Sequence, residues 1–211
     1  MDAKSIDLIA FPSACYLKLK NMTLTHFKRF QMELDLTNWS SGEDAVAGPL
    51  APQYRFLAWD EQDLARHARV KFQTFEFEID AHVFPSLSEY EGCHRLMTQI
   101  TNRDNFIPEA TWLVEFQLDE AASPIAVGTI QVLHDLENRG AIQNIAITPD
   151  HRHQGIGTAL VNRALSNLKS LDIPRAMLEV TAQNNGALRL YKRLGFEIIK
   201  TVYKPSTVKT S

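Results

Sequence analysis

The feature that most constrains the fold of this sequence is a glycine-containing loop between an apolar run and a strongly periodic segment. The run is rich in β-branched residues and ends at Ile147, and the loop that follows carries Gly155 and Gly157. From Ile156 to Leu171 the apolar residues recur at helical spacing, which predicts an amphipathic helix. The pattern therefore predicts a strand, a loop and a helix in direct succession.

The start of this predicted helix suits an anion such as a phosphate or a pyrophosphate. Gly155 and Gly157 have no Cβ, so their backbone can take positive φ and a ligand can approach the amides closely. The first amides of a helix have no internal partner, and the helix dipole adds roughly half a positive charge there. The alternative interpretation is an ordinary helix start with glycines in its loop.

Two other phosphate-binding motifs fail on specific residues. A P-loop requires a lysine after its last glycine, whereas Thr158 follows Gly157. The dinucleotide fingerprint requires a small residue three positions after its second glycine, where this chain has Leu160. Neither motif describes this loop.

A second pattern downstream gives the loop its context. Arg175–Thr181 predicts a strand, and Ala187–Leu194 predicts a short helix that Gly195 ends. The two patterns are Arg152-x-x-Gly155-x-Gly157 and Asn184-x-x-Ala187-x-x-Leu190-Tyr191-x-x-x-Gly195-Phe196. Together they resemble the two cofactor motifs of the GNAT acetyltransferase superfamily. The resemblance covers Ala141 to about Tyr203, and this part is most similar to protein N-terminal and ribosomal-protein alanine acetyltransferases.

The resemblance implies acetyl-CoA as the cofactor and coenzyme A as a product. Loop amides would hold the pyrophosphate, and the preceding strand would splay from its neighbour and pair with the pantetheine amides. Asn184 would hydrogen-bond the pantetheine arm or cap the last helix. Ala146 and Ile147 would border the acyl pocket, whose depth, and hence the acyl chain, stays open. The expected cofactor-binding residues are Ile145, Ala146, Ile147, Arg152, His153, Gln154, Gly155, Ile156, Gly157, Thr158, Asn184 and Tyr191.

The resemblance also implies that Tyr191 protonates the departing thiolate, although a core tyrosine is the alternative interpretation. The acceptor amine must lose a proton before it attacks, usually to a carboxylate or to ordered water. The backbone amide of the splayed strand would hold the carbonyl oxygen as charge develops on it. Gln143 and Asn144 stand where many relatives carry a glutamate, and neither amide can act as a base. The base must therefore lie elsewhere.

Candidates for the base lie between the first two predicted helices, in the segment that covers the acceptor pocket in this family. Glu78 is the expected base, and Glu78, Asp80 and Phe84 are the expected substrate-binding residues. Flanking apolar residues, Phe77 among them, would partly desolvate these carboxylates and raise their pKa values. A solvated helix end is the alternative for this segment, and Asp80, Glu179 or ordered water are the other candidates for the base.

Composition agrees with a cytoplasmic enzyme. The 211 residues carry a net charge of −3, so nothing favours a nucleic-acid surface. His151 and His153 have no third ligand nearby, which argues against a metal site. Cys15 and Cys93 do not form a disulfide framework, and no signal peptide or membrane span is predicted. We expect a monomer or a homodimer without nucleic-acid or membrane partners.

The element order predicts an α/β (α+β) GNAT fold: a mixed, mostly antiparallel sheet with helices on both faces and a splayed strand pair. Residues 1–53 form an N-terminal extension with one added strand and a loop, and residues 54–211 form the acetyltransferase domain. Tyr54–Trp59 is expected to pair with the added strand, Phe27–Leu36. The other predicted elements are helices over Asp60–Phe75 and Glu89–Asn102 and a hairpin of Thr111–Phe116 with Ile125–Val132.

The expected function is direct transfer of an acetyl group from acetyl-CoA to a primary amine of a small molecule or a protein N-terminus. The missing acid at Gln143 and Asn144 motivates a second hypothesis. In that hypothesis the chain is an acyl-CoA-binding sensor or regulatory module that lacks turnover. Tyr191 argues against it, because a protein that only binds has no need of a proton donor.

Overall fold

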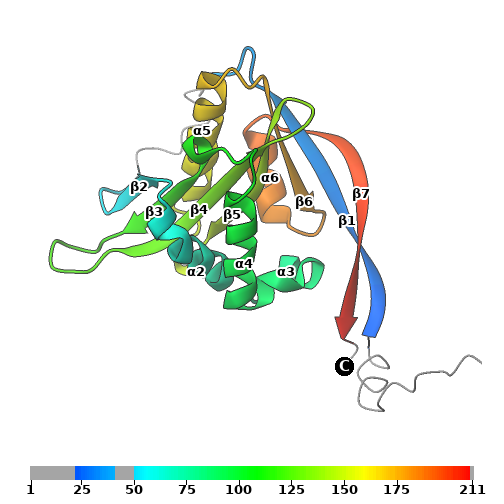
Figure 1. The fold of residues 1–211 in the computed structure, drawn as a ribbon, viewed down its shortest axis with the longest axis horizontal. Helices are drawn as coiled ribbons and strands as arrows, with labels where there is room; N and C mark the ends of the chain where they lie inside the picture. Colours follow the sequence, from blue (N-terminus) through cyan, green and yellow to red (C-terminus); the bar gives the residue numbers. More distant parts are fainter. Residues whose placement is uncertain (1–21, 41–49, 210–211) are drawn as a thin grey trace, which may run out of the picture.

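The computed structural model describes residues 22–40 and 50–209. Cys15 and most of the loop predicted before Tyr54 lie outside these residues. A seven-stranded sheet in the order β2-β3-β4-β5-β6-β1-β7 forms the centre (Figure 1). The strands are β1 (Met22–Asp35), β2 (Tyr54–Ala58), β3 (Trp112–Phe116), β4 (Ile125–His134), β5 (Arg139–Ile147), β6 (Arg175–Thr181) and β7 (Glu197–Lys209). All neighbouring pairs are antiparallel except β5 and β6, so the predicted fold class is confirmed.

Helices cover both faces of the sheet, and each face has its own apolar core. One core contains buried residues of α5, such as Leu160 and Leu165, and the other contains Ala68 of α2 and Met97 of α4. Burial of a leucine or methionine side chain contributes about 1.5–3 kcal/mol. The helices are α2 (Leu64–Phe75), α3 (Ile79–Val83), α4 (Tyr90–Thr101), α5 (Ile156–Ser170) and α6 (Asn185–Arg193). The predicted helices and the predicted hairpin are confirmed, and Asp60 caps the short 3-10 turn Glu61–Asp63 that leads into α2.

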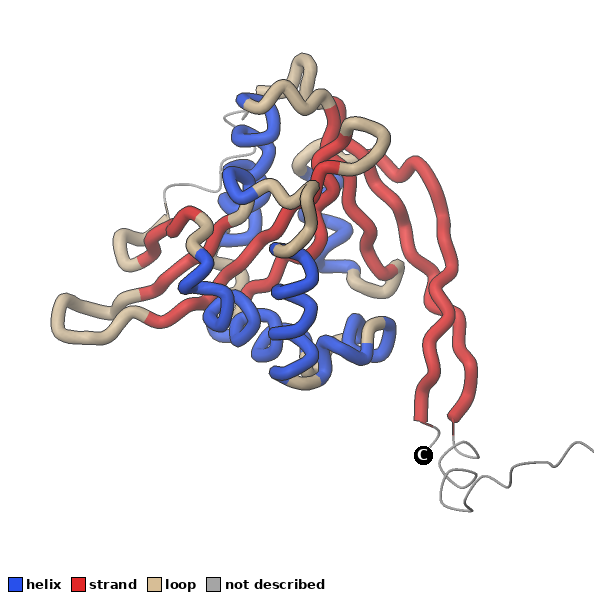
Figure 2. The backbone as a smooth tube through the Cα atoms, in the orientation of Figure 1, coloured by secondary structure: helices blue, strands red, loops and turns tan. Residues whose placement is uncertain are grey.

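The predicted partner of the Tyr54 strand was wrong. β2 pairs with β3, with Tyr54 opposite Phe116, and it therefore forms one edge of the sheet. β1 instead lies between β6 and β7 and pairs antiparallel with both. The alternation of its side chains suits this place. Met32 of β1, and Leu36 directly after it, are buried in the α5 core, while Arg29 and Glu33 point to the opposite face. Beyond the end of β6, β1 and β7 continue as a two-stranded ribbon (Figure 2).

The sheet is opened by a splay between β5 and β6. The two strands pair only from Arg139 opposite Arg175 to Ile142 opposite Leu178. Beyond that point β5 continues to Ile147 without pairing to β6, so the splay predicted from the sequence is confirmed. Gln143 is an extra residue in the pairing of β5 with β4, a β-bulge that shifts the alternation of the strand.

Candidate active site

Two cavities meet at the splay. The larger, of about 800 Å³, lies against the glycine loop and the start of α5, and we call it the loop cleft. The smaller, of about 390 Å³, lies between the splayed strands and the segment that contains α3, and we call it the splay cavity. The residues that line both are Phe75, Asp80, Ile145, Asn184, Ala187 and Tyr191. A ligand in one cavity can therefore reach a ligand in the other at this junction.

The loop cleft has the character of an anion site. Gly155 precedes α5 with a φ of 80°, a left-handed conformation that favours glycine, and no side chain caps the helix. The first amides of α5 are thus left for a ligand. Gly157 already lies within the helix and its φ is not positive, so only the first glycine needs its conformational freedom. Of the predicted loop residues, His153, Gly155, Ile156, Gly157 and Thr158 line the cleft, whereas Gln154 does not.

Arg152 and Glu78 form an ion pair at the wall of the loop cleft. A guanidinium nitrogen of Arg152 lies 2.7 Å from a Glu78 carboxylate oxygen. Arg152 also donates to the carbonyl oxygens of Ile147 and Thr74, at 3.2 and 3.3 Å. Glu78 lines the loop cleft and not the splay cavity. Glu78 therefore lies on the side of the glycine loop, and Phe77, expected to shield it, is 91% exposed.

The end of β5 divides its side chains between the two sides of the sheet. Ile145 lines both cavities and Ile147 lines the loop cleft. Ala146 is buried in the opposite core beside α2, so its side chain does not border either cavity. Asn184 caps α6 by accepting from the Ala187 amide at 3.1 Å, which confirms one of its two predicted roles.

Tyr191 lies at the junction of the cavities, on α6. Burial, together with the nearby Asp80 carboxylate, raises the pKa of its phenol well above the ordinary value. None of the described residues hydrogen-bonds the hydroxyl, so its proton is available to a ligand. Tyr191 also packs in the core, so the alternative interpretation of a core tyrosine describes its packing, and its role as a proton donor stays a prediction.

Two carboxylates line the splay cavity. Asp80 accepts from the Thr181 hydroxyl at 2.7 Å and from the Asn184 amide at 3.4 Å, so both of its oxygens are engaged. Glu179 lies on β6 and its side chain is 40% exposed. One Glu179 oxygen pairs with Arg29 at 3.3 Å, and the other has no hydrogen-bond partner among the described residues. Glu179 therefore has one carboxylate oxygen left to accept a hydrogen bond from a ligand, whereas both oxygens of Asp80 already accept one.

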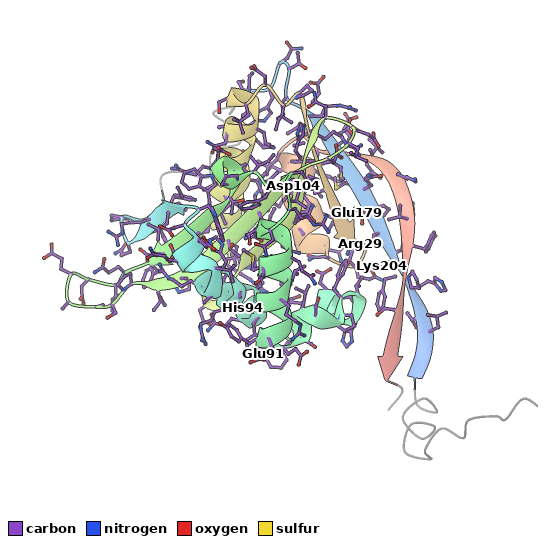
Figure 3. The ribbon with its side chains drawn as sticks, in the orientation of Figure 1. Arg29, Glu91, His94, Asp104, Glu179 and Lys204 are labelled. Carbon is purple, nitrogen blue, oxygen red and sulfur yellow. The ribbon has the colours of Figure 1, made fainter. Side chains whose placement is uncertain are left out.

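Two positively charged side chains that line the splay cavity, Arg29 and Lys204, were not predicted from the sequence. Arg29 on β1 is buried and donates to the Thr181 hydroxyl and to the Glu179 carbonyl, both at 3.0 Å. It also lies 4.7 Å from the centre of the Phe84 ring, and the ammonium of Lys204 on β7 lies 4.0 Å from the same centre. Desolvation and the charge of Arg29 lower the pKa of Lys204. Figure 3 shows Arg29, Glu179 and Lys204 gathered on neighbouring strands.

The sheet with its splay, the glycine loop and the junction tyrosine together define a class of protein. The chain belongs to the acetyltransferase (GNAT) family, whose model matches residues 73–196. In the described residues no cluster of three potential metal ligands occurs, and none of the described helices is long and apolar enough to cross a membrane.

Individual relatives agree with this family. The chain is 34% identical over 96 residues to the [ribosomal protein bS18]-alanine N-acetyltransferase of Escherichia coli, which covers 44% of this chain and 63% of that protein. Among solved structures, a GCN5-related N-acetyltransferase from Sphaerobacter thermophilus has a TM-score of 0.60 at 16% identity, covering 93% of this chain and 56% of that one. The PaiA N-acetyltransferase from Thermoplasma acidophilum, in complex with coenzyme A, has a TM-score of 0.54 at 15% identity, covering 74% and 98%. These two likenesses concern the fold.

Proposed function

We propose that this protein transfers an acetyl group from acetyl-CoA directly to a primary amine. The observation that carries the proposal is the meeting of the loop cleft and the splay cavity at Tyr191. Acetyl-CoA would occupy the loop cleft with its pyrophosphate at the start of α5, and the amine would enter from the splay cavity. The neighbour solved with coenzyme A shares this fold, which supports the assignment of the cofactor.

The proposed mechanism assigns one proton to each of two side chains. Glu179 accepts a proton from the ammonium form of the acceptor through its unpaired oxygen, because Asp80 is already engaged and Glu78 faces the other cavity. The amine nitrogen then attacks the thioester carbonyl carbon, and the exposed edge of β5 offers an amide to the developing oxyanion. When the carbon–sulfur bond breaks, Tyr191 donates its proton to the thiolate. The attacking nitrogen loses its second proton as the amide forms, and water carries that proton back to the Tyr191 phenolate.

The acceptor is proposed to be a small-molecule amine or a protein N-terminus. The Escherichia coli relative acts, by its name, on an alanine of a ribosomal protein. This chain covers less than two thirds of that relative, so a protein N-terminus is one candidate among amines. The Glu179 oxygen that has no hydrogen-bond partner among the described residues would accept a hydrogen bond from an amine of either kind.

Thiol release from acetyl-CoA tests the proposal. Incubation with a panel of amines and short peptides should release coenzyme A together with the N-acetylated product, identified by mass spectrometry. Absence of turnover with every amine, alongside tight binding of acetyl-CoA, would instead support the sensor hypothesis.

A further inference from the structure

One buried charge near the splay cavity takes no part in the proposed chemistry. Lys71 of α2 is 0% exposed, and it forms no salt bridge with any described residue. A buried ammonium without a carboxylate destabilises a fold, and an apolar residue of similar size would stabilise it. A structural role alone therefore does not account for a lysine at this position.

The partner of Lys71 is a residue of the splay cavity. The Lys71 Nζ atom lies 2.7 Å from the Oδ1 atom of Asn144, on β5. Asn144 faces α2 because the bulge at Gln143 shifts the alternation of the strand at this point. Asn144 lines the splay cavity but not the loop cleft, so its side chain belongs to the acceptor's side of the junction.

The orientation of the Asn144 amide follows from this contact. An ammonium only donates hydrogen bonds, so Lys71 must face the amide oxygen. Burial lowers the pKa of Lys71 to about 7, and the neutral amine also carries N–H donors for the same oxygen. The amide nitrogen of Asn144 has no hydrogen-bond partner among the described residues. Asn144 therefore offers an N–H donor to the splay cavity, whereas an acidic side chain at this position would offer an acceptor.

We infer that Asn144, positioned by Lys71, binds a carbonyl oxygen adjacent to the acceptor amine. The acceptor class is then an α-aminoacyl compound, such as an amino acid, its amide or a peptide N-terminus, in preference to an alkylamine. The inference rests on the proposed function, and it names the substrate class of the same site. Asn144 acts as a specificity residue and Lys71 as a positioning residue behind it.

The test compares leucinamide with 3-methylbutylamine, which lacks only the carboxamide group of leucinamide. In Asn144→Ala and in Lys71→Met, the ratio of kcat/KM for leucinamide to that for 3-methylbutylamine should fall roughly 5- to 10-fold, as loss of one hydrogen bond implies. The loss should lie in the KM for leucinamide rather than in kcat. The two amines have different pKa values, but this difference affects the ratio equally in every variant. A change of the ratio relative to the wild type therefore reports on the protein.

Cys93→Ala is the control, because Cys93 of α4 is buried beside Lys71 and lines neither cavity. Its ratio should equal that of the wild type. An unchanged ratio in both Asn144→Ala and Lys71→Met, with both amines acetylated, would overturn the inference and leave the proposed function standing. Failure of the wild type to acetylate any amine would overturn both.

Discussion

At the scale of single residues, the splay cavity separates carboxylates that look equivalent in the sequence. Glu78 pairs with Arg152 at the loop cleft, both oxygens of Asp80 accept hydrogen bonds, and one oxygen of Glu179 has no hydrogen-bond partner among the described residues. Spacing along the chain could not distinguish them, because the distinction comes from partners that are distant in sequence. The place of Tyr191 on a short helix was predictable, since it belongs to a local motif of α6, while its catalytic role stays a prediction.

Substitution of Glu179 tests this assignment of the base. Glu179→Gln should lower the rate of acetylation by about 10²-fold or more at neutral pH, and the defect should shrink as pH rises toward the pKa of the amine. A base matters only while the amine carries its proton. The matched Glu78→Gln variant should instead weaken coenzyme A binding by releasing Arg152, with an unchanged pH profile. The reverse pattern, read from pH–rate profiles of both variants, would return the role to Glu78.

Lys71 gives a residue-scale prediction for stability. Its pKa falls from 10.5 to about 7 in the folded protein, so between these values the unfolded chain binds a proton that the folded protein lacks. Stability of the wild type should therefore rise with pH through this window, because the cost of removing this proton on folding falls as pH approaches the unfolded pKa. Lys71→Met should raise the free energy of unfolding by about 1–4 kcal/mol near pH 7, and by less toward pH 10. Urea unfolding at several pH values measures this gain, and destabilisation independent of pH would refute it.

At the scale of elements, short-range patterns were predictable and strand partners were not. Apolar periodicity gave the helices and strands because each element buries one face locally. The insertion of β1 between β6 and β7 and the bulge at Gln143 depend on pairing across the sheet, which no local pattern records. Arg29 was missed for the same reason, since its partners come from β6 and α3.

The loop before α5 gives an element-scale prediction. Gly155→Ala should lower stability by about 1 kcal/mol and weaken coenzyme A binding, because a Cβ resists the φ of 80°. In Gly157→Ala the new Cβ would lie 3.3 Å from a Leu190 methyl group, which can move, so the helix should keep its stability. Thermal unfolding and calorimetry with coenzyme A measure both effects. Equal stability of the two variants would contradict the assigned roles of these glycines.

At the scale of the whole molecule, the first described strand is an interior strand of the sheet. It separates β6 from β7, and the side chains of Met32 and of Leu36, which directly follows the strand, are buried in the same core as α5. It also supplies Arg29 to the splay cavity. We propose that the folding unit therefore begins before residue 54.

Met32 tests this proposal. Met32→Ala should lower the free energy of unfolding by about 2–5 kcal/mol, because the side chain is fully buried. Lys28→Ala, on an exposed position of the same strand, should change it by no more than about 0.5 kcal/mol. Similar small effects in chemical unfolding of both variants would mean that β1 contributes little to the core.

The most direct measurement of the central claim pairs turnover with cofactor binding in Tyr191→Phe. The ring still packs and only the hydroxyl is lost, so affinity for coenzyme A by calorimetry should stay within about threefold of the wild type. Thiol release with an acceptor amine should fall by about 10²-fold or more, as expected for the loss of a general acid. Turnover equal to that of the wild type, or a loss of affinity with turnover intact, would contradict acetyl transfer at the junction of the two cavities.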